Sequence, residues 1–167
     1  MSLFLLGLLS NKTELQSIEI SMELKLQEYK QTDFDACMDL FDSNCPAYFA
    51  IEERIDYQNY LKFNEDKYLL GYIDESLIGC FGITKHDQIT CSISWIMVSP
   101  SHHRGGYGSQ MMEHFLDYVR KMNMKRVLVA TSQHAENFFK KFGAYREGYI
   151  EDGWGKGMHQ VNMEIDL

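Results

Sequence analysis

A glycine-rich stretch in the second half of the chain decides the fold, and it reads Ser99-Pro100-Ser101-His102-His103-Arg104-Gly105-Gly106-Tyr107-Gly108-Ser109. An apolar run from Ile93 to Val98 precedes it and is typical of a strand, while Met111 to Met122 follows it with apolar residues at helical spacing. Glycine lets a backbone bend sharply and lets a ligand approach it closely. Because a helix N-terminus presents unpaired N–H groups and a partial positive charge, the stretch predicts a cradle for an anion, most often a phosphate.

Two familiar phosphate loops do not fit this stretch. The P-loop requires a lysine after its second glycine, and the chain has no glycine pair followed by lysine at that spacing. The dinucleotide fingerprint G-x-G-x-x-G begins at Gly106-Tyr107-Gly108, but Met111 stands in place of its third glycine. The next strand-like run, 126–131, carries no acidic residue for a ribose. These departures argue against a nicotinamide or flavin site.

The stretch resembles instead the pyrophosphate loop of the GNAT superfamily of N-acetyltransferases, whose pattern is [QR]-x-x-G-x-[GA]. Gly106 and Gly108 are in register with that pattern, and Pro100 precedes it by three residues. His103 stands where the family has Gln or Arg, and the adjacent Arg104 is placed to supply the missing charge. A tight strand-to-helix turn that binds no ligand is the alternative interpretation.

A second stretch, 132–144, resembles the late motif of the same family, N-x-x-A-x-x-[FL]-Y-x-x-x-G-[FA]. Ala135, Phe138 and Gly143 fall in register, with Gly143 placed to end a short helix. Ser132 stands where the family often has Asn, and Phe139 stands where it often has Tyr. Alone, this stretch would be an ordinary amphipathic helix, but two motifs in the right order strengthen the resemblance.

The resemblance covers residues 22–167 and implies one GNAT domain, with residues 1–21 as an extension or an artefact. The implied fold is α/β: a central mixed, mostly antiparallel, twisted sheet of about six to seven strands with helices on both faces. Thr32 and Asp35 are spaced as a capping box for the first helix, and Asp74-Glu75-Ser76 reads as a hairpin turn. We expect strands at 23–29, 67–73, 77–84, 89–98, 127–131, 145–150 and 159–166, and helices at 32–41, 48–63, 107–122 and 135–142.

The resemblance also implies acyl transfer from acetyl-CoA, with the pyrophosphate on the glycine-rich loop and the pantetheine along the preceding strand. The implied cofactor-binding residues are Met97, Val98, His103, Arg104, Gly105, Gly106, Tyr107, Gly108, Ser109, Ser132, Asn137 and Phe139. The histidines and cysteines show no spacing typical of a metal site, so we expect no metal.

The acid and base of the reaction are left open by the sequence. Ser94 lies on the central strand near the position where family members often have glutamate, and Phe139 cannot donate a proton as a tyrosine would. Glu52, Glu53 and Asp56 are further candidates for the base, because the second helix borders the acceptor cleft in this fold.

The segment 151–159 resembles the long loop that borders the acceptor site between the last two strands of the fold. There Asp152 would hold an ammonium group and Trp154 would wall the pocket. The alternative is a glycine-rich hairpin with Trp154 packed against the sheet or another subunit. The implied acceptor is the primary amine of a small molecule or a peptide. The rival function is a non-catalytic acyl-CoA-binding or regulatory domain of the same fold, favoured by Phe139 and the missing strand glutamate.

Composition limits the partners. The chain has 167 residues, and its 24 acidic and 16 basic residues give a net charge of −8, which argues against a nucleic acid partner. Residues 3–9 are apolar but far too short to span a bilayer, so we expect no membrane contact. Cys37, Cys45, Cys80 and Cys91 form no C-x-x-C pair and predict free thiols in a reducing cytoplasm. A homodimer is left open.

Overall fold

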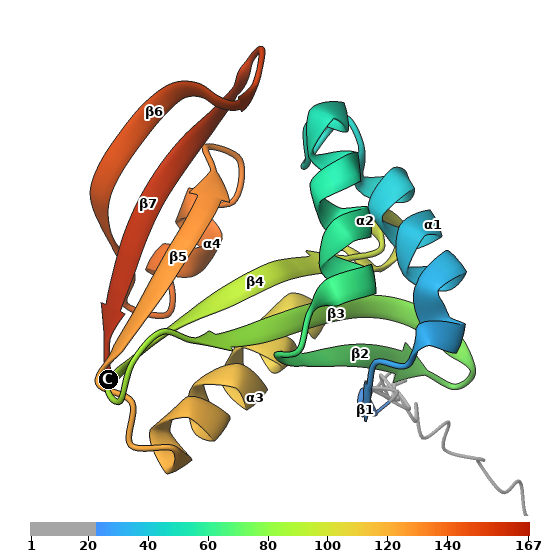
Figure 1. Ribbon diagram of the computed structural model, residues 1–167, viewed down its shortest axis with the longest axis horizontal. Coiled ribbons are helices and arrows are strands. Elements are labelled where there is room, and N and C mark those ends of the chain that lie inside the picture. The colour runs from blue at the N-terminus through green and yellow to red at the C-terminus, as the bar shows by residue number, and fades with distance from the viewer. Residues whose placement is uncertain (1–22) are drawn as a thin grey trace, which may run out of the picture.

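The fold is built on one seven-stranded sheet, which a computed structural model describes over residues 23–167 (Figure 1). Its strands are β1 (Lys25–Glu28), β2 (Lys67–Ile73), β3 (Ser76–Lys85), β4 (Thr90–Val98), β5 (Arg126–Ser132), β6 (Tyr145–Gly155) and β7 (Met158–Asp166). The helices are α1 (Phe34–Asn44), α2 (Arg54–Phe63), α3 (Tyr107–Lys121) and α4 (Glu136–Lys140), with short 3-10 turns η1 (Gln31–Asp33), η2 (Ile51–Glu53) and η3 (Pro100–His102). The extension expected at 1–21 lies outside the described residues.

The sheet order is β1-β2-β3-β4-β5-β7-β6, and all neighbouring strands are antiparallel except the parallel pair β4 and β5. A parallel pair needs a long crossover, which α3 supplies here between β4 and β5. The predicted mixed, mostly antiparallel sheet with helices on both faces is confirmed.

The helices divide into two layers, one on each face of the sheet. Phe41 of α1 and Tyr57 of α2 are fully buried in a core that includes Tyr68 of β2 and Met97 of β4. On the opposite face, α3 and α4 share a second core whose members include Phe115, Val119, Val127, Phe139 and Met163. In the described part of the chain, no helix is both long and apolar enough to cross a membrane.

Strands β4 and β5 pair over only part of their length. Thr90 to Ile93 pair with Arg126 to Val129, and beyond these residues β4 continues to Val98 and β5 to Ser132 without pairing. The divergence leaves the backbone of both strands open toward the space between them. This space positions the site described below.

A bulge at Trp95 accompanies the divergence. The register between β3 and β4 shifts there, and Trp95 adopts a φ of 47°, which is a strained conformation for a bulky residue. The indole is held by four aromatic rings whose centroids lie 5.0–6.2 Å away, those of Phe41, Phe49, Tyr57 and Tyr60. The packing of these rings stabilises the bulge and offsets the strain in its backbone.

Three local expectations are corrected by the structure. The capping box expected at Thr32 and Asp35 does not form, because the Lys30 N–H donates to Asp33 Oδ2 at 2.8 Å and a 3-10 turn precedes α1. The second helix starts at Arg54 rather than at residue 48, after the separate turn η2. Strand β6 extends to Gly155, so the long loop expected at 151–159 is a tight hairpin. Cys37, Cys45, Cys80 and Cys91 are free, as expected.

Candidate active site

A cavity of about 1020 Å³ lies where β4 and β5 diverge. Its lining comes from β4, β5 and β7, from the loop before α3, from α4, and from the segment between α1 and α2. The cavity is large enough for a drug-sized ligand and carries both apolar surface and a few polar groups, as binding sites do. It is therefore the first place to look for chemistry.

The glycine-rich loop forms one end of this cavity. Gly106 caps α3 with a φ of 77°, and a Cβ added there would meet no atom within 4 Å. Gly106, Tyr107, Gly108 and Ser109 all line the cavity, so the first turn of α3 presents its unpaired N–H groups to it. The geometry is that of an anion cradle at a helix N-terminus, where the helix dipole also favours negative charge.

His103 ties the loop to strand β4. Its Nε2 lies 2.9 Å from the Val98 carbonyl oxygen, and since a carbonyl only accepts, Nε2 carries the proton and donates. The Tyr48 ring packs against this imidazole with centroids 4.8 Å apart. Arg104 is exposed at the rim of the cavity with a φ of 67°, and within residues 23–167 it makes no ion pair.

The structure places most of the expected cofactor residues on the cavity wall. Those on the wall are Met97, Val98, His103, Arg104, Gly106, Tyr107, Gly108, Ser109, Ser132 and Phe139. Gly105 and Asn137 are exposed and do not line it. Phe139 lines the cavity but is only 2% exposed, because most of its ring is part of the core beneath α4.

The structure distinguishes between the three acidic candidates near α2 by their position relative to the cavity. Glu53 lines the cavity and is 8% exposed, whereas Glu52 and Asp56 do not line it and are exposed. Glu53 Oε2 accepts the Ala50 N–H at 2.8 Å, which fixes the carboxyl group in place. Burial raises the pKa of Glu53 to about 7, the Ala50 hydrogen bond opposes this, and the charges of Asp56 and Glu52 add to it.

Hydroxyl groups of β4 line the same cavity as this acid. Ser94 Oγ lies 3.3 Å from Thr84 Oγ1, and Ser92 Oγ lies 3.0 Å from His86 Nε2. Ser92, Ser94 and His86 all line the cavity. His86 was not among the expected site residues, because it follows β3 and reaches the site only through the β3–β4 pairing.

The β6–β7 hairpin closes another side of the cavity. Trp154 lines it and donates from Nε1 to the Thr131 carbonyl at 2.9 Å. Asp152 does not line it: its Oδ1 accepts the Gly157 N–H at 2.8 Å, and its own N–H donates to His159 Nδ1 at 3.0 Å. The Asp152 side chain thus closes the hairpin turn.

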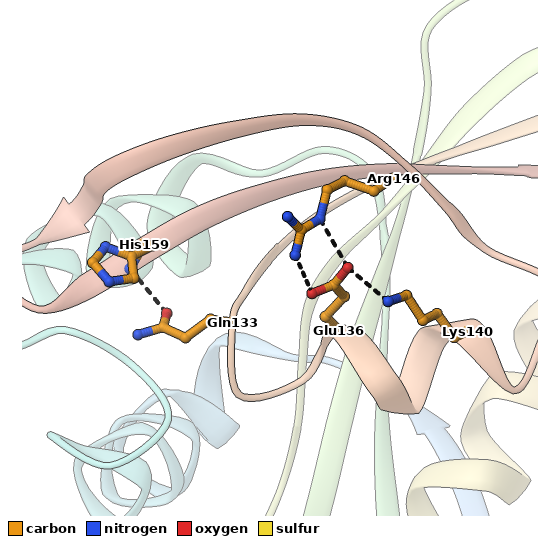
Figure 2. Close-up of polar contacts among 5 residues, drawn as sticks. All are labelled: Gln133, Glu136, Lys140, Arg146 and His159. Atoms are coloured by element: carbon orange, nitrogen blue, oxygen red, sulfur yellow. Dashed lines mark hydrogen bonds and ion pairs between the residues drawn. The ribbon is translucent and has the colours of Figure 1, made fainter.

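Two polar clamps hold the hairpin and α4 in place (Figure 2). Gln133 accepts the His159 N–H at 2.9 Å and donates to the Gly157 carbonyl at 2.8 Å. Glu136 of α4 accepts Arg146 Nε of β6 at 2.9 Å and pairs with Lys140 at 3.0 Å. The hydrogen bonds from Arg146 and Lys140 lower the pKa of Glu136 to about 2.

The further polar residues of the cavity that were not expected include Glu147, Asn162 and Glu164. They lie on β6 and β7, which carry no recognisable motif. The alternation of Asn162 and Glu164 with buried Val161, Met163 and Ile165 was the one available signal, since it marks a strand with one polar face. Within residues 23–167, no group of three or more His, Cys, Asp or Glu side chains is arranged to hold a metal ion.

Comparisons with known proteins agree with this geometry. The acetyltransferase (GNAT) family matches residues 34–144, whereas no curated protein matches the chain. Ard1 from Thermoplasma volcanium has a similar structure, with a TM-score of 0.71 and 17% identity over 86% of this chain and 97% of that one. A GNAT family acetyltransferase from Elizabethkingia anophelis, solved with acetyl-CoA bound, has a TM-score of 0.64 and 16% identity over 86% and 98%.

An aminoglycoside 6'-N-acetyltransferase complexed with coenzyme A has a TM-score of 0.68 and 12% identity, covering 85% of this chain and 96% of that one. At these identities the likeness establishes the fold. The family match is independent of it and spans two thirds of the chain, from the start of α1 through the anion cradle to the end of the α4 segment. The chain therefore belongs to the acetyltransferase (GNAT) family.

Proposed function

We propose that this protein transfers the acetyl group of acetyl-CoA to an amine. The observation that carries the proposal is that one cavity joins an anion cradle at the start of α3 to a buried carboxyl group, Glu53, across the gap between β4 and β5. Binding of an anionic acyl carrier and removal of a proton from an amine are the two tasks that such an arrangement suits.

The residues present fit acetyl-CoA. The open space over Gly106 and the first-turn N–H groups of α3 suit the pyrophosphate, with Arg104 beside it. The backbone of β4 from Ser94 to Val98 does not pair with β5, and the groups that His103 leaves free there suit the amide groups of pantetheine. When bound, acetyl-CoA supplies an acetyl group joined to a thiol that leaves readily.

Glu53 is the group we assign to proton removal. An amine is protonated near neutral pH and must lose a proton before its nitrogen can form a bond to the acetyl carbon. Glu53 takes that proton, directly or through one water, and the neutral nitrogen then forms the new C–N bond as the C–S bond breaks and releases its second proton to solvent. The departing thiolate takes its proton from solvent, because Phe139 has no proton to donate. A pKa near 7 places Glu53 close to the optimum for a base at neutral pH.

The test measures release of the free CoA thiol over a panel of primary amines, with Glu53→Gln and Asp56→Asn as matched variants. Gln retains an oxygen to accept the Ala50 N–H, so the fold is kept while the basicity is lost. We expect Glu53→Gln to lower kcat about 10²-fold with unchanged CoA affinity, and Asp56→Asn to stay near wild type. The wild-type kcat/KM should rise with pH and level off above about pH 7, because the base acts only when deprotonated.

Equal rates for the two variants would remove Glu53 from the mechanism. Tight binding of acetyl-CoA without turnover on any amine would instead favour the rival function, an acyl-CoA-binding domain. The observation that supports this rival function is Phe139, which stands where the family often has a tyrosine.

A further inference from the structure

Charge is segregated within the cavity. Its two permanently cationic side chains, Arg104 and Lys141, come from the loop before α3 and from the end of α4, which lie on the same face of the sheet. Its three carboxyl groups, Glu53, Glu147 and Glu164, come from η2, β6 and β7. One end therefore suits a polyanion, and the other suits a cation.

Two of these carboxyl groups, Glu147 and Glu164, come from the paired strands β6 and β7. Glu147 lines the cavity from the bulge between Arg146 and Gly148, where β6 shifts its register against β7. Glu164 points to the face of the sheet that α4 does not cover, because it alternates on β7 with Met163 and Ile165, which are buried in the core shared by α3 and α4. Helices α1 and α2 pack over β2 to β4, and in residues 23–167 no helix lies over this side of β5 and β7 (Figure 1).

The register aligns this face with the reacting end of the cavity. Ser92 of β4 pairs with Leu128 of β5, and Leu128 pairs with Glu164 of β7, so these residues form one row across the sheet. Two strand spacings separate β4 from β7, which is about 10 Å. The next row holds the exposed Ala130 and the half-buried Asn162, which both line the cavity.

We propose that the acceptor amine carries a second positive charge, and that this second cation binds beside Glu147 and Glu164 while the reacting amine lies near Ser94 and Glu53. The inference rests on the proposed function for the identity of the reacting end. It assigns the substrate class as an extended diamine, or a longer amine with two cationic nitrogens, rather than a simple monoamine.

Glu147 is the residue on which to test this assignment. Glu164 is partly neutralised by Arg126, whose Nη1 lies 3.7 Å from Oε2, but both side chains are partly exposed and such a pair contributes little. Glu147 makes no ion pair in the described part of the chain. Glu151 is an exposed acid four residues further along β6 that does not line the cavity, so Glu151→Gln is a control for the loss of one negative charge.

The experiment compares kcat/KM for α,ω-diamines, from diaminopropane to diaminooctane, with the monoamine of the same length. We expect the longer diamines to be preferred by at least about tenfold, or about 1.4 kcal/mol. Glu147→Gln should remove most of this preference, and Glu151→Gln should keep it. Calorimetric binding of diaminohexane and hexylamine to the CoA-saturated protein measures the same selectivity without turnover.

Equal kcat/KM for diamines and monoamines would overturn the inference while leaving acetyl transfer in place. Equal effects of Glu147→Gln and Glu151→Gln would overturn it too, because general charge would then explain the selectivity. If no amine is acetylated, but diaminohexane binds more tightly than hexylamine in a Glu147-dependent manner, the proposed function fails and the cation site stands.

Discussion

At the scale of single residues, Glu53, the base of the proposed reaction, shows how burial of an acidic group opposes stability. Its carboxyl group is 8% exposed and has one hydrogen bond, to the Ala50 N–H. Burial favours the neutral form, so the folded state holds the proton more tightly than the unfolded chain does. The same burial that makes Glu53 a suitable base at neutral pH therefore makes its ionised form unfavourable for folding.

The pH dependence of stability tests this assignment. Because the folded pKa of about 7 lies above the ordinary value of 4.5, the free energy of unfolding should fall as pH rises through that window. The Glu53→Gln variant has no carboxyl group at this position, so this fall in the free energy of unfolding should be absent from it. We expect equal stability for the two proteins below about pH 4, and a variant more stable by about 1–3 kcal/mol above about pH 8, measured by urea unfolding. A variant that is less stable at high pH would show that the ionised carboxylate stabilises the fold.

Gly106 and Gly143 form a matched pair for testing the anion cradle. Both have a positive φ, 77° and 87°, and a Cβ at either meets no atom within 4 Å. Replacing either by Ala should therefore cost a similar strain of about 1–2 kcal/mol. Only Gly106→Ala places a methyl group over the cradle, so it alone should weaken CoA binding at least about tenfold in calorimetry. Wild-type affinity in Gly106→Ala would remove the pyrophosphate from this loop.

At the scale of elements, α4 has only five residues and depends on the pair between Glu136 and Arg146, which attaches it to β6. Arg146 and Lys140 both pair with Glu136, whose side chain is 10% exposed. The short helix carries Phe139, which forms part of both the cavity wall and the core. Its attachment therefore connects sheet stability with the shape of the cofactor end.

Replacing Glu136 by Gln should lower the free energy of unfolding by about 1–3 kcal/mol at neutral pH, because two charge-assisted contacts are lost. Asp42→Asn is the matched control. Asp42 pairs with Arg54, and both side chains are more than 40% exposed, so its loss should cost less than about 1 kcal/mol. Since the pKa of Glu136 is lowered to about 2, its contribution should be complete above about pH 4.5 and disappear as pH falls toward 2. Equal losses in the two variants at neutral pH would show that the anchor is no stronger than a surface pair.

Elements were predictable where local chemistry determines them. The cradle, the hairpin turn at Asp74 and the strand-helix order follow from neighbouring residues. The glycines at 153, 155 and 157 predicted a loop, but Gly153 lies within β6, where the close approach of the Gln160 side chain leaves no room for a Cβ. The bulge at Trp95 depends on aromatic rings from α1, α2 and the segment between them, which no local pattern reports.

At the scale of the whole molecule, the site exists because β4 and β5 part after Ile93 and the two helical layers lie on opposite faces. The cofactor end was accessible to sequence reasoning because its residues are consecutive. Of the acidic end, Glu53 was among the candidates for the base, but Glu147 and Glu164 were not expected, because they are far from it in the chain and reach the cavity only through sheet pairing and the packing of the β6–β7 hairpin on η2.

The central claim is that this cavity moves an acetyl group from CoA to an amine. The most direct measurement follows acetyl-CoA labelled in its acetyl group through a single turnover with excess wild-type protein and diaminohexane. We predict that the label appears as an amide on the diamine while CoA thiol is released in equal amount. Label that stays on CoA, in a protein shown by calorimetry to bind acetyl-CoA, would contradict the account and identify a binding domain instead.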